Sequence, residues 1–178
     1  MKQHLELKDM VSCALFISLI ILGSHISIPI PVGPVPITLA DFFVMLAGMF
    51  LTVKNSLITI ILYLTLGLIG LPVFSNGNSG FAFFLGPTGG FLLGYIFLAT
   101  VISLTKSKVK KNVLRDVTAI IIGNFFLYGI GLLWLYRFIG NGYVVLATGL
   151  IPFLPGSIIK IIVVLMISKT ISSKSILE

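Results

Sequence analysis

Long hydrophobic runs follow one another along this chain, separated by short segments rich in proline, glycine or lysine. The runs lack the strict alternation of polar and apolar residues that a membrane β-strand requires, so they predict helices rather than a barrel. A helix crosses the hydrocarbon core with about 20 residues, and about 17 suffice only when it stands nearly upright. The pattern predicts six membrane-spanning helices, with approximate bounds at residues 10–28, 37–53, 56–71, 86–104, 117–136 and 156–171.

The composition agrees with this interpretation. Of the 178 residues, 57% are hydrophobic and only 10% are charged, and the mean hydropathy is +1.17. A soluble domain carries about 25% charged residues, so the chain is interpreted as an integral membrane protein. The first run is long enough to span the bilayer and continues into a proline-rich loop, so we expect it to be retained rather than cleaved as a signal peptide. The predicted fold class is an all-α, six-helix membrane bundle that forms one domain over residues 1–178.

The basic residues indicate how the helices are oriented. The formal net charge is +7, but the lysines and arginines fall in short loops and near the termini, so we do not expect a nucleic-acid site. With six spans, every basic residue except Lys160 and Arg137 lies on one side of the membrane. The positive-inside rule then predicts that both termini are cytoplasmic. The cluster from Lys106 to Arg115 is expected to touch anionic lipid headgroups.

The opposite side is predicted to carry three loops with almost no charge. In residues 29–36 prolines alternate with other residues, which excludes a helix and predicts a stiff extended strap. Residues 71–85 contain a polar run from Ser75 to Gly80 that predicts a flexible loop, and residues 137–155 form the third loop. Together they are interpreted as a cover over a ligand cavity beneath the extracellular loops, although any one of them is equally consistent with a plain connector.

The most informative polar residues lie at the start of the last predicted span. Lys160 is followed by mostly aliphatic residues, which places its ammonium group inside the membrane, where an unpaired charge costs at least a few kcal/mol. Ser157 precedes it by nearly one helical turn, so the two side chains point toward the same region. The pair indicates a binding site. The alternative is that the Lys160 side chain extends to an interface and keeps its charge in water.

Asp41 is the second charged residue that falls inside a predicted span. It lies close to the start of the second span, where its carboxylate could simply complement the helix dipole. The alternative is that Asp41 faces the same cavity as Lys160.

Small residues predict where helices approach one another closely. Gly86, Gly90 and Gly94 recur every four residues and form a smooth ridge, and Ala14 and Ser18 form a second seam in the first span. The partner of that second seam is either a neighbouring helix or another protein. The chain has no Walker A motif, no group of residues with metal-ligand spacing and no nucleophile-base pair. We therefore expect no enzymatic activity, no cofactor and no metal.

Four short motifs occur in this order: PVPITL at 34–39, LPVF at 71–74, LGPTGG at 85–90 and FLPG at 153–156. In sequence and spacing they resemble the BioY family, the biotin-specific S components of energy-coupling factor (ECF) transporters. The resemblance covers nearly the whole chain. It implies a six-helix subunit in the bacterial plasma membrane that captures biotin outside the cell. The subunit would pass biotin inward in a complex with a transmembrane coupling subunit and two cytoplasmic ATPases, which agrees with the missing Walker motif.

The resemblance also implies roles for particular residues. Ala14 and Ser18 match the seam that contacts the coupling subunit. Ligand contacts are implied in the first two outward loops and at the start of the last span, and an aromatic wall or cover is expected beside them. The expected substrate-binding residues are Thr38, Asp41, Asn76, Asn78, Gly89, Phe91, Tyr143, Ser157 and Lys160. Lys160 would serve either the carboxylate or the ureido oxygen of biotin, and both options stay open at this point.

Three positions depart from the usual pattern of the family, and each loses hydrogen-bonding capacity. Ser157 stands where an acid is common, Phe91 where a tyrosine is common and Ala40 where a glutamine is common. We hypothesise that Asp41 takes over part of the lost function. The departures leave a biotin-like acid, dethiobiotin or lipoate, as an alternative ligand. Two other functions are a solitary ion-coupled carrier with Asp41 as its protonation site, and an intramembrane enzyme, for which the sequence offers no acidic, His or Cys cluster.

Overall fold

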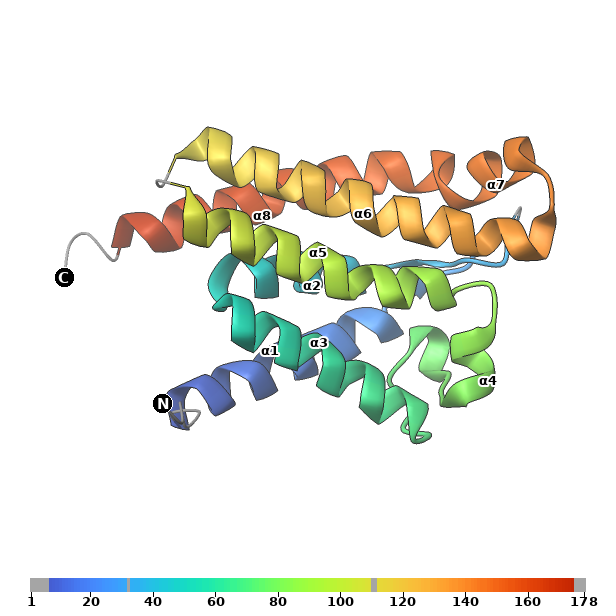
Figure 1. The fold of residues 1–178 in the computed structure, drawn as a ribbon, viewed down its shortest axis with the longest axis horizontal. Coiled ribbons are helices and arrows are strands. Elements are labelled where there is room, and N and C mark those ends of the chain that lie inside the picture. Colours follow the sequence, from blue (N-terminus) through green and yellow to red (C-terminus); the bar gives the residue numbers. More distant parts are fainter. Residues whose placement is uncertain (1–6, 32, 110–111, 175–178) are drawn as a thin grey trace.

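The structure is a computed structural model that describes residues 7–31, 33–109 and 112–174. Its helices form an elongated bundle in which α1 begins and the last helix ends at the same end (Figure 1). The main helices are α1 (Leu7–His25), α2 (Ala40–Phe50), α3 (Val53–Leu68), α5 (Gly89–Lys108), α6 (Val113–Ile139) and α8 (Leu154–Lys174). The short elements are β1 (Ser27–Ile28), β2 (Ile37–Thr38), η1 (Ser75–Gly77), α4 (Gly80–Leu85), α7 (Gly142–Gly149) and η2 (Ile151–Phe153).

Among the residues that the structure describes, four helical segments are long and apolar enough to cross a membrane, namely α1, α5, α6 and the stretch Gly142–Thr170, which includes most of α8. The chain is therefore an all-α membrane protein. The predicted second span differs most from the structure, because α2 has only 11 residues and Ile37–Thr38 forms a strand instead. Only Leu51 and Thr52 separate α2 from α3, and the Thr52 side chain accepts a hydrogen bond from the Asn55 backbone amide at 3.2 Å. This N-cap, which hydrophobicity does not reveal, separates the two helices.

The residues on either side of the proline-rich strap pair with each other. Strands β1 and β2 run antiparallel, with Ser27 opposite Thr38 and Ile28 opposite Ile37. The segment between them packs on α7, since a side chain at Gly33 would come within 2.9 Å of Thr148. The segment contains no helix, as the prolines predict, but it is not one extended strap: it reverses direction between the two strands, and the Gly33 amide donates to the Ile30 carbonyl oxygen at 3.3 Å. This reversal and the contact with α7 depend on tertiary structure.

The second and third loops, which the sequence predicted to face outward, each contain a short helix that the sequence did not predict. Helix α4 forms in the second, where Phe83 stacks on the buried Phe74 with ring centroids 5.6 Å apart. Helix α7 forms in the third, and the Asn141 side chain caps it by accepting from the amides of Tyr143 and Val144. Packing and capping therefore order segments that composition alone predicts to be loops.

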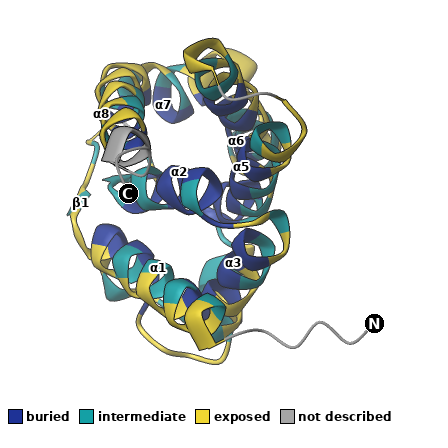
Figure 2. Cartoon of the chain, turned by 90° about the vertical axis from the view of Figure 1, so that its left-hand side faces the viewer, coloured by how far each residue is buried: buried dark blue, intermediate teal, exposed yellow. Residues whose placement is uncertain are grey.

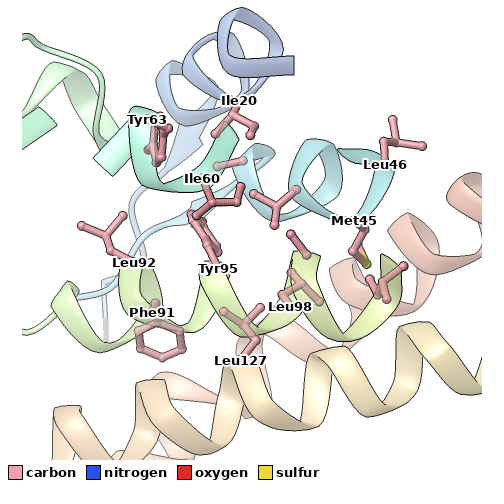
Figure 3. Packing of buried hydrophobic residues seen from close by; sticks show 14 of the residues in the cluster. Ile20, Met45, Leu46, Ile60, Tyr63, Phe91, Leu92, Tyr95, Leu98 and Leu127 are labelled. Carbon is pink, nitrogen blue, oxygen red and sulfur yellow. The ribbon is translucent and has the colours of Figure 1, made fainter. Parts of the chain in front are cut away.

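Buried residues gather along the centre of the bundle, and exposed residues form its outer surface (Figure 2). Figure 3 shows that α5 contributes Phe91, Leu92, Tyr95 and Leu98 to this core, which is completed by residues of α1, α2, α3 and α6. The spacing of Phe91, Tyr95 and Leu98 places them on one face of α5. The core thus reaches the N-terminal end of α5, where the outward segments meet.

The predicted glycine ridge is confirmed for two of its three members. An added methyl group at Gly90 would lie 2.2 Å from Cβ of Trp134, and one at Gly94 would lie 2.8 Å from a Leu127 methyl group. Both glycines let α5 approach α6 closely. Gly86 precedes α5 and lies outside the ridge.

We predict that Gly94→Ala lowers the thermal unfolding temperature in detergent, because the new methyl group has no room against α6. Gly129→Ala in α6 is the control, since nothing lies within 4 Å of the added group. Alanine is the better helix former by about 1 kcal/mol, so this variant should be neutral or stabilised. Equal unfolding temperatures for the two variants would contradict the packing described for α5 and α6.

Candidate ligand-binding site

A buried ion pair connects the last helix to the second. Lys160 of α8 donates to Oδ1 of Asp41 at 2.7 Å and to Oδ2 at 2.9 Å, and it donates to the carbonyl oxygen of Thr38 at 2.7 Å. Lys160 is 9% exposed and Asp41 is 8% exposed. The Lys160 side chain therefore does not extend to an interface. An ammonium group has three donors, and all three have acceptors here.

The local structure explains how Asp41 and Thr38 come to face Lys160. Asp41 lies in the first turn of α2, and Thr38 ends β2 just before it. The Leu39 amide between them donates to the carbonyl oxygen of Gly23 at 3.0 Å, which fixes this segment to the end of α1. Strand β2, which follows the strap, therefore supplies a backbone acceptor, and α2 supplies a carboxylate. Both interpretations of Asp41 hold, because it lies at a helix N-terminus and also faces Lys160.

Ser157 lies one turn before Lys160 and is buried. Its hydroxyl forms a short hydrogen bond with the hydroxyl of Tyr128 on α6, and either group could be the donor. Tyr128, rather than Ser157, lines the hollow beside Lys160. Ser157 thus acts on the hollow through Tyr128.

Two small hollows, each of about 40 Å³, lie at this end of the bundle. The first contains the charged pair and Tyr128, and it has an aromatic wall in which Phe91 stacks on Phe153 with centroids 6.2 Å apart. The second is lined by neutral hydroxyl groups and aromatic rings, among them Ser24, Tyr63 and Thr88. The residues shared by both hollows are Val35, Pro36, Thr38, Phe91 and Tyr95. These shared side chains form a thin partition between a charged and a neutral compartment.

A larger hollow of about 630 Å³ lies at the opposite end of the bundle, beside Asp9, Lys54 and Lys106. It adjoins the lysine-rich end that the sequence predicts to be cytoplasmic. A ligand that enters from outside would not meet it first, so we place the ligand site at the two smaller hollows.

The predicted site residues divide into those that line or contact the first hollow and those that do not. Thr38, Asp41, Phe91 and Lys160 line the first hollow, and Ser157 contacts its wall. Gly89 is buried but lines neither hollow, and an added methyl group there would lie 1.8 Å from the Phe84 carbonyl oxygen, so close packing accounts for this glycine.

The structure places three predicted residues away from both hollows. Tyr143 is 81% exposed on α7, and Asn76 and Asn78 are exposed in and beside η1. Ser75 is the residue of this polar segment that reaches the second hollow. The loop composition indicated the segment but not which side chain turns inward, because that choice follows from Asn76 adopting a left-handed conformation at φ 58°.

Sequence reasoning missed Tyr95, Tyr63, Ser24 and Thr88. One available signal was the four-residue spacing from Phe91 to Tyr95, which places an aromatic ring and a phenol on one face of a span. Another was the position of Thr88 within the LGPTGG motif.

Comparison with known proteins shows the family of the chain and agrees with its fold. The BioY family model matches residues 1–175. The chain belongs to the BioY family. Among its relatives, the probable biotin transporter BioY of Pyrococcus horikoshii is 37% identical over 156 residues, which is 88% of this chain and 91% of that protein. The biotin transporter BioY of Thermotoga maritima is 34% identical over 162 residues, or 91% of this chain and 94% of that protein.

A solved structure has the same BioY fold. It is the crystal structure of the S component for biotin from an ECF-type ABC transporter, with a TM-score of 0.86 and 32% sequence identity. The match covers 97% of this chain and 95% of that chain.

The buried pair gives a prediction about stability. Removing one partner leaves an uncompensated charge, so we expect Asp41→Leu or Lys160→Met alone to destabilise the protein by about 3–5 kcal/mol. The double variant removes both charges and should recover most of that loss. Thermal unfolding of the unmodified protein, the two single variants and the double variant in detergent measures the coupling free energy between the two side chains. Additive losses of stability would contradict a direct interaction.

Proposed function

We propose that this chain is the membrane-embedded biotin-binding S component of an ATP-driven ECF vitamin transporter. Family membership and the two biotin transporters that it resembles support this function. The observation that carries the proposal is the buried Asp41–Lys160 pair beside two adjoining hollows, in a fold that matches a biotin S component. The chain is then a transporter subunit rather than an enzyme, with biotin as its transported ligand.

The proposed topology has six spans, formed by α1, α2, α3, α5, α6 and α8, in a bacterial plasma membrane with both termini in the cytoplasm. Helix α2 has 11 residues, and with a rise of about 1.5 Å per residue it is too short to cross the hydrocarbon core of a bilayer. Most of its residues are buried by other helices, so its length need not match the lipid. Lys8, Lys106 and Lys169 lie toward the end where α1 begins and α8 ends, which supports a cytoplasmic position for that end.

Biotin would occupy both hollows. Each hollow of about 40 Å³ has room for only a few water-sized groups, whereas biotin has a double ring, an aliphatic chain and a carboxylate. Binding therefore requires the partition of Phe91, Tyr95 and the strap residues to move. The cavity would open beneath the outward segments, with the strap, α4 and α7 as its cover.

The ureido group is the best match for the charged compartment. Asp41 provides an acceptor for a ureido N–H, and Lys160 provides a donor for the ureido oxygen. The two charges nearly cancel, so this compartment attracts a carboxylate less strongly than a lone lysine would. In this arrangement Asp41 supplies the carboxylate that the family commonly has at the position of Ser157. Dethiobiotin has the same ureido group, whereas lipoate has none.

The proposed partners are a transmembrane coupling subunit and two cytoplasmic ATPases. The Ala14 and Ser18 side chains are exposed on α1, and the Ser18 hydroxyl bonds back to the Ala14 carbonyl oxygen at 2.9 Å. The seam is therefore smooth and available to another helix. We propose that the coupling subunit packs against it.

Lys160→Met should weaken biotin binding by about 10- to 100-fold, because it removes a charge-assisted hydrogen bond to the ligand. Lys169→Met on the exposed side of the same helix is the control and should bind as the unmodified protein does. Calorimetric titration of the purified proteins with biotin, dethiobiotin and lipoate measures both effects. The proposal expects lipoate to bind weakest. Unchanged biotin affinity in a folded Lys160→Met protein would count against the site.

A further inference from the structure

Thr88 has a hydroxyl group that the fold leaves unused. The residue is 9% exposed and lines the second hollow. Within the part of the chain that the structure describes, its Oγ1 atom has no hydrogen-bond partner. Thr88 is the N-cap residue of α5, yet its side chain makes no capping hydrogen bond. A buried hydroxyl group without a partner is unfavourable, and the residue that carries this one lines a hollow.

Other hydroxyl groups of the second hollow are paired. The Ser24 hydroxyl donates to the Ile20 carbonyl oxygen at 3.0 Å and lies 2.9 Å from the Tyr63 hydroxyl. The Tyr63 hydroxyl also lies 3.2 Å from the Val73 carbonyl oxygen, to which it can donate. Thr88 therefore differs from Ser24 and Tyr63, because its lost hydration is not replaced by a protein partner.

The backbone around Thr88 is held in place. Trp134 donates from Nε1 to the Gly86 carbonyl oxygen at 2.9 Å, two residues before Thr88. Gly89 and Gly90, which follow Thr88, pack too closely against Phe84 and Trp134 to admit a side chain. These contacts restrict movement of the Thr88 backbone, so the residue stays in the wall of the hollow. Such a fixed donor is suited to bind a ligand without reorganisation.

We propose that Thr88 is a specificity-determining residue that donates a hydrogen bond to the carboxylate of the ligand. This inference rests on the proposed function. The residues that line the second hollow are uncharged, and the hollow adjoins the N-terminus of α5, a 20-residue helix whose dipole favours an anion. The first hollow already pairs Lys160 with Asp41. A ligand with a ureido group in the first hollow therefore places its carboxylate in the second.

The test measures biotin affinity by calorimetry for Thr88→Val, Thr88→Ser and Thr100→Val. Valine has nearly the shape of threonine without the hydroxyl group, so Thr88→Val should bind biotin about tenfold more weakly or worse, whereas Thr88→Ser should retain most of the affinity. Thr100→Val is the matched control. Thr100 also lies on α5 with an unpaired buried Oγ1, but it lines neither hollow, so biotin affinity should not change.

Ligand analogues separate a direct contact from a structural effect. Biotinamide lacks the negative charge, so the loss caused by Thr88→Val should be much smaller for biotinamide than for biotin. For 2-iminobiotin, which is altered at the ureido group, the loss should equal that for biotin. Equal losses for biotin and biotinamide, or wild-type affinity of a folded Thr88→Val protein, would overturn the inference. The proposed function would survive either result provided that the Lys160→Met variant binds biotin more weakly than the unmodified protein.

Discussion

The ion pair between Lys160 and Asp41 is the constraint on which the site depends. Burying two charges costs several kcal/mol per ion, and only close approach and saturated hydrogen bonding offset that cost. The structure meets both conditions, because Lys160 donates to two carboxylate oxygens and to the Thr38 carbonyl oxygen. One interaction thereby joins α8, α2 and the strand that ends the strap. The outward segments and the membrane helices are linked at this point.

This link suggests how ligand binding could change the shape of the protein. All three donors of Lys160 are in use, so a ligand that bonds to Lys160 must replace one of the present acceptors. If the ligand replaces the Thr38 carbonyl oxygen, the contact between α8 and the strap is lost and the ligand connects them instead. The two hollows are also too small for biotin until Phe91 or Tyr95 moves. Binding and rearrangement of the strap are therefore coupled in this account.

Much of the fold was predictable because hydrophobic runs and prolines act locally. The apolar runs predicted the long helices, and the prolines correctly excluded a helix between α1 and α2, although not the turn that the segment makes there. The hydrophobic pattern predicted a break between the second and third spans at residues 54–55, but the structure has it at Leu51 and Thr52, because the Thr52 side chain caps α3. Helices α4 and α7 were missed because the Phe74–Phe83 stack and the Asn141 cap, which order them, do not show in loop composition.

Sequence reasoning identified both charged residues of the candidate site, together with Thr38 and Phe91, but missed several other neutral residues. A charge inside a membrane span is conspicuous in the sequence, which is why Lys160 and Asp41 were identified. Tyr95, Tyr128 and Thr88 carry no such signal, since a phenol or hydroxyl group in a span is usual. Tyr143 and Asn76 were misplaced because their positions depend on how α7 and η1 turn relative to the core.

The central claim is that Asp41 provides the carboxylate that the site requires. The most direct measurement is the biotin affinity of Asp41→Asn and of the exchanged double variant Asp41→Ser/Ser157→Asp, determined by calorimetric titration. Asp41→Asn should lose at least about tenfold in affinity, and the exchange should recover much of it, because an acid at position 157 lies one turn from Lys160. Wild-type affinity of Asp41→Asn would contradict the account.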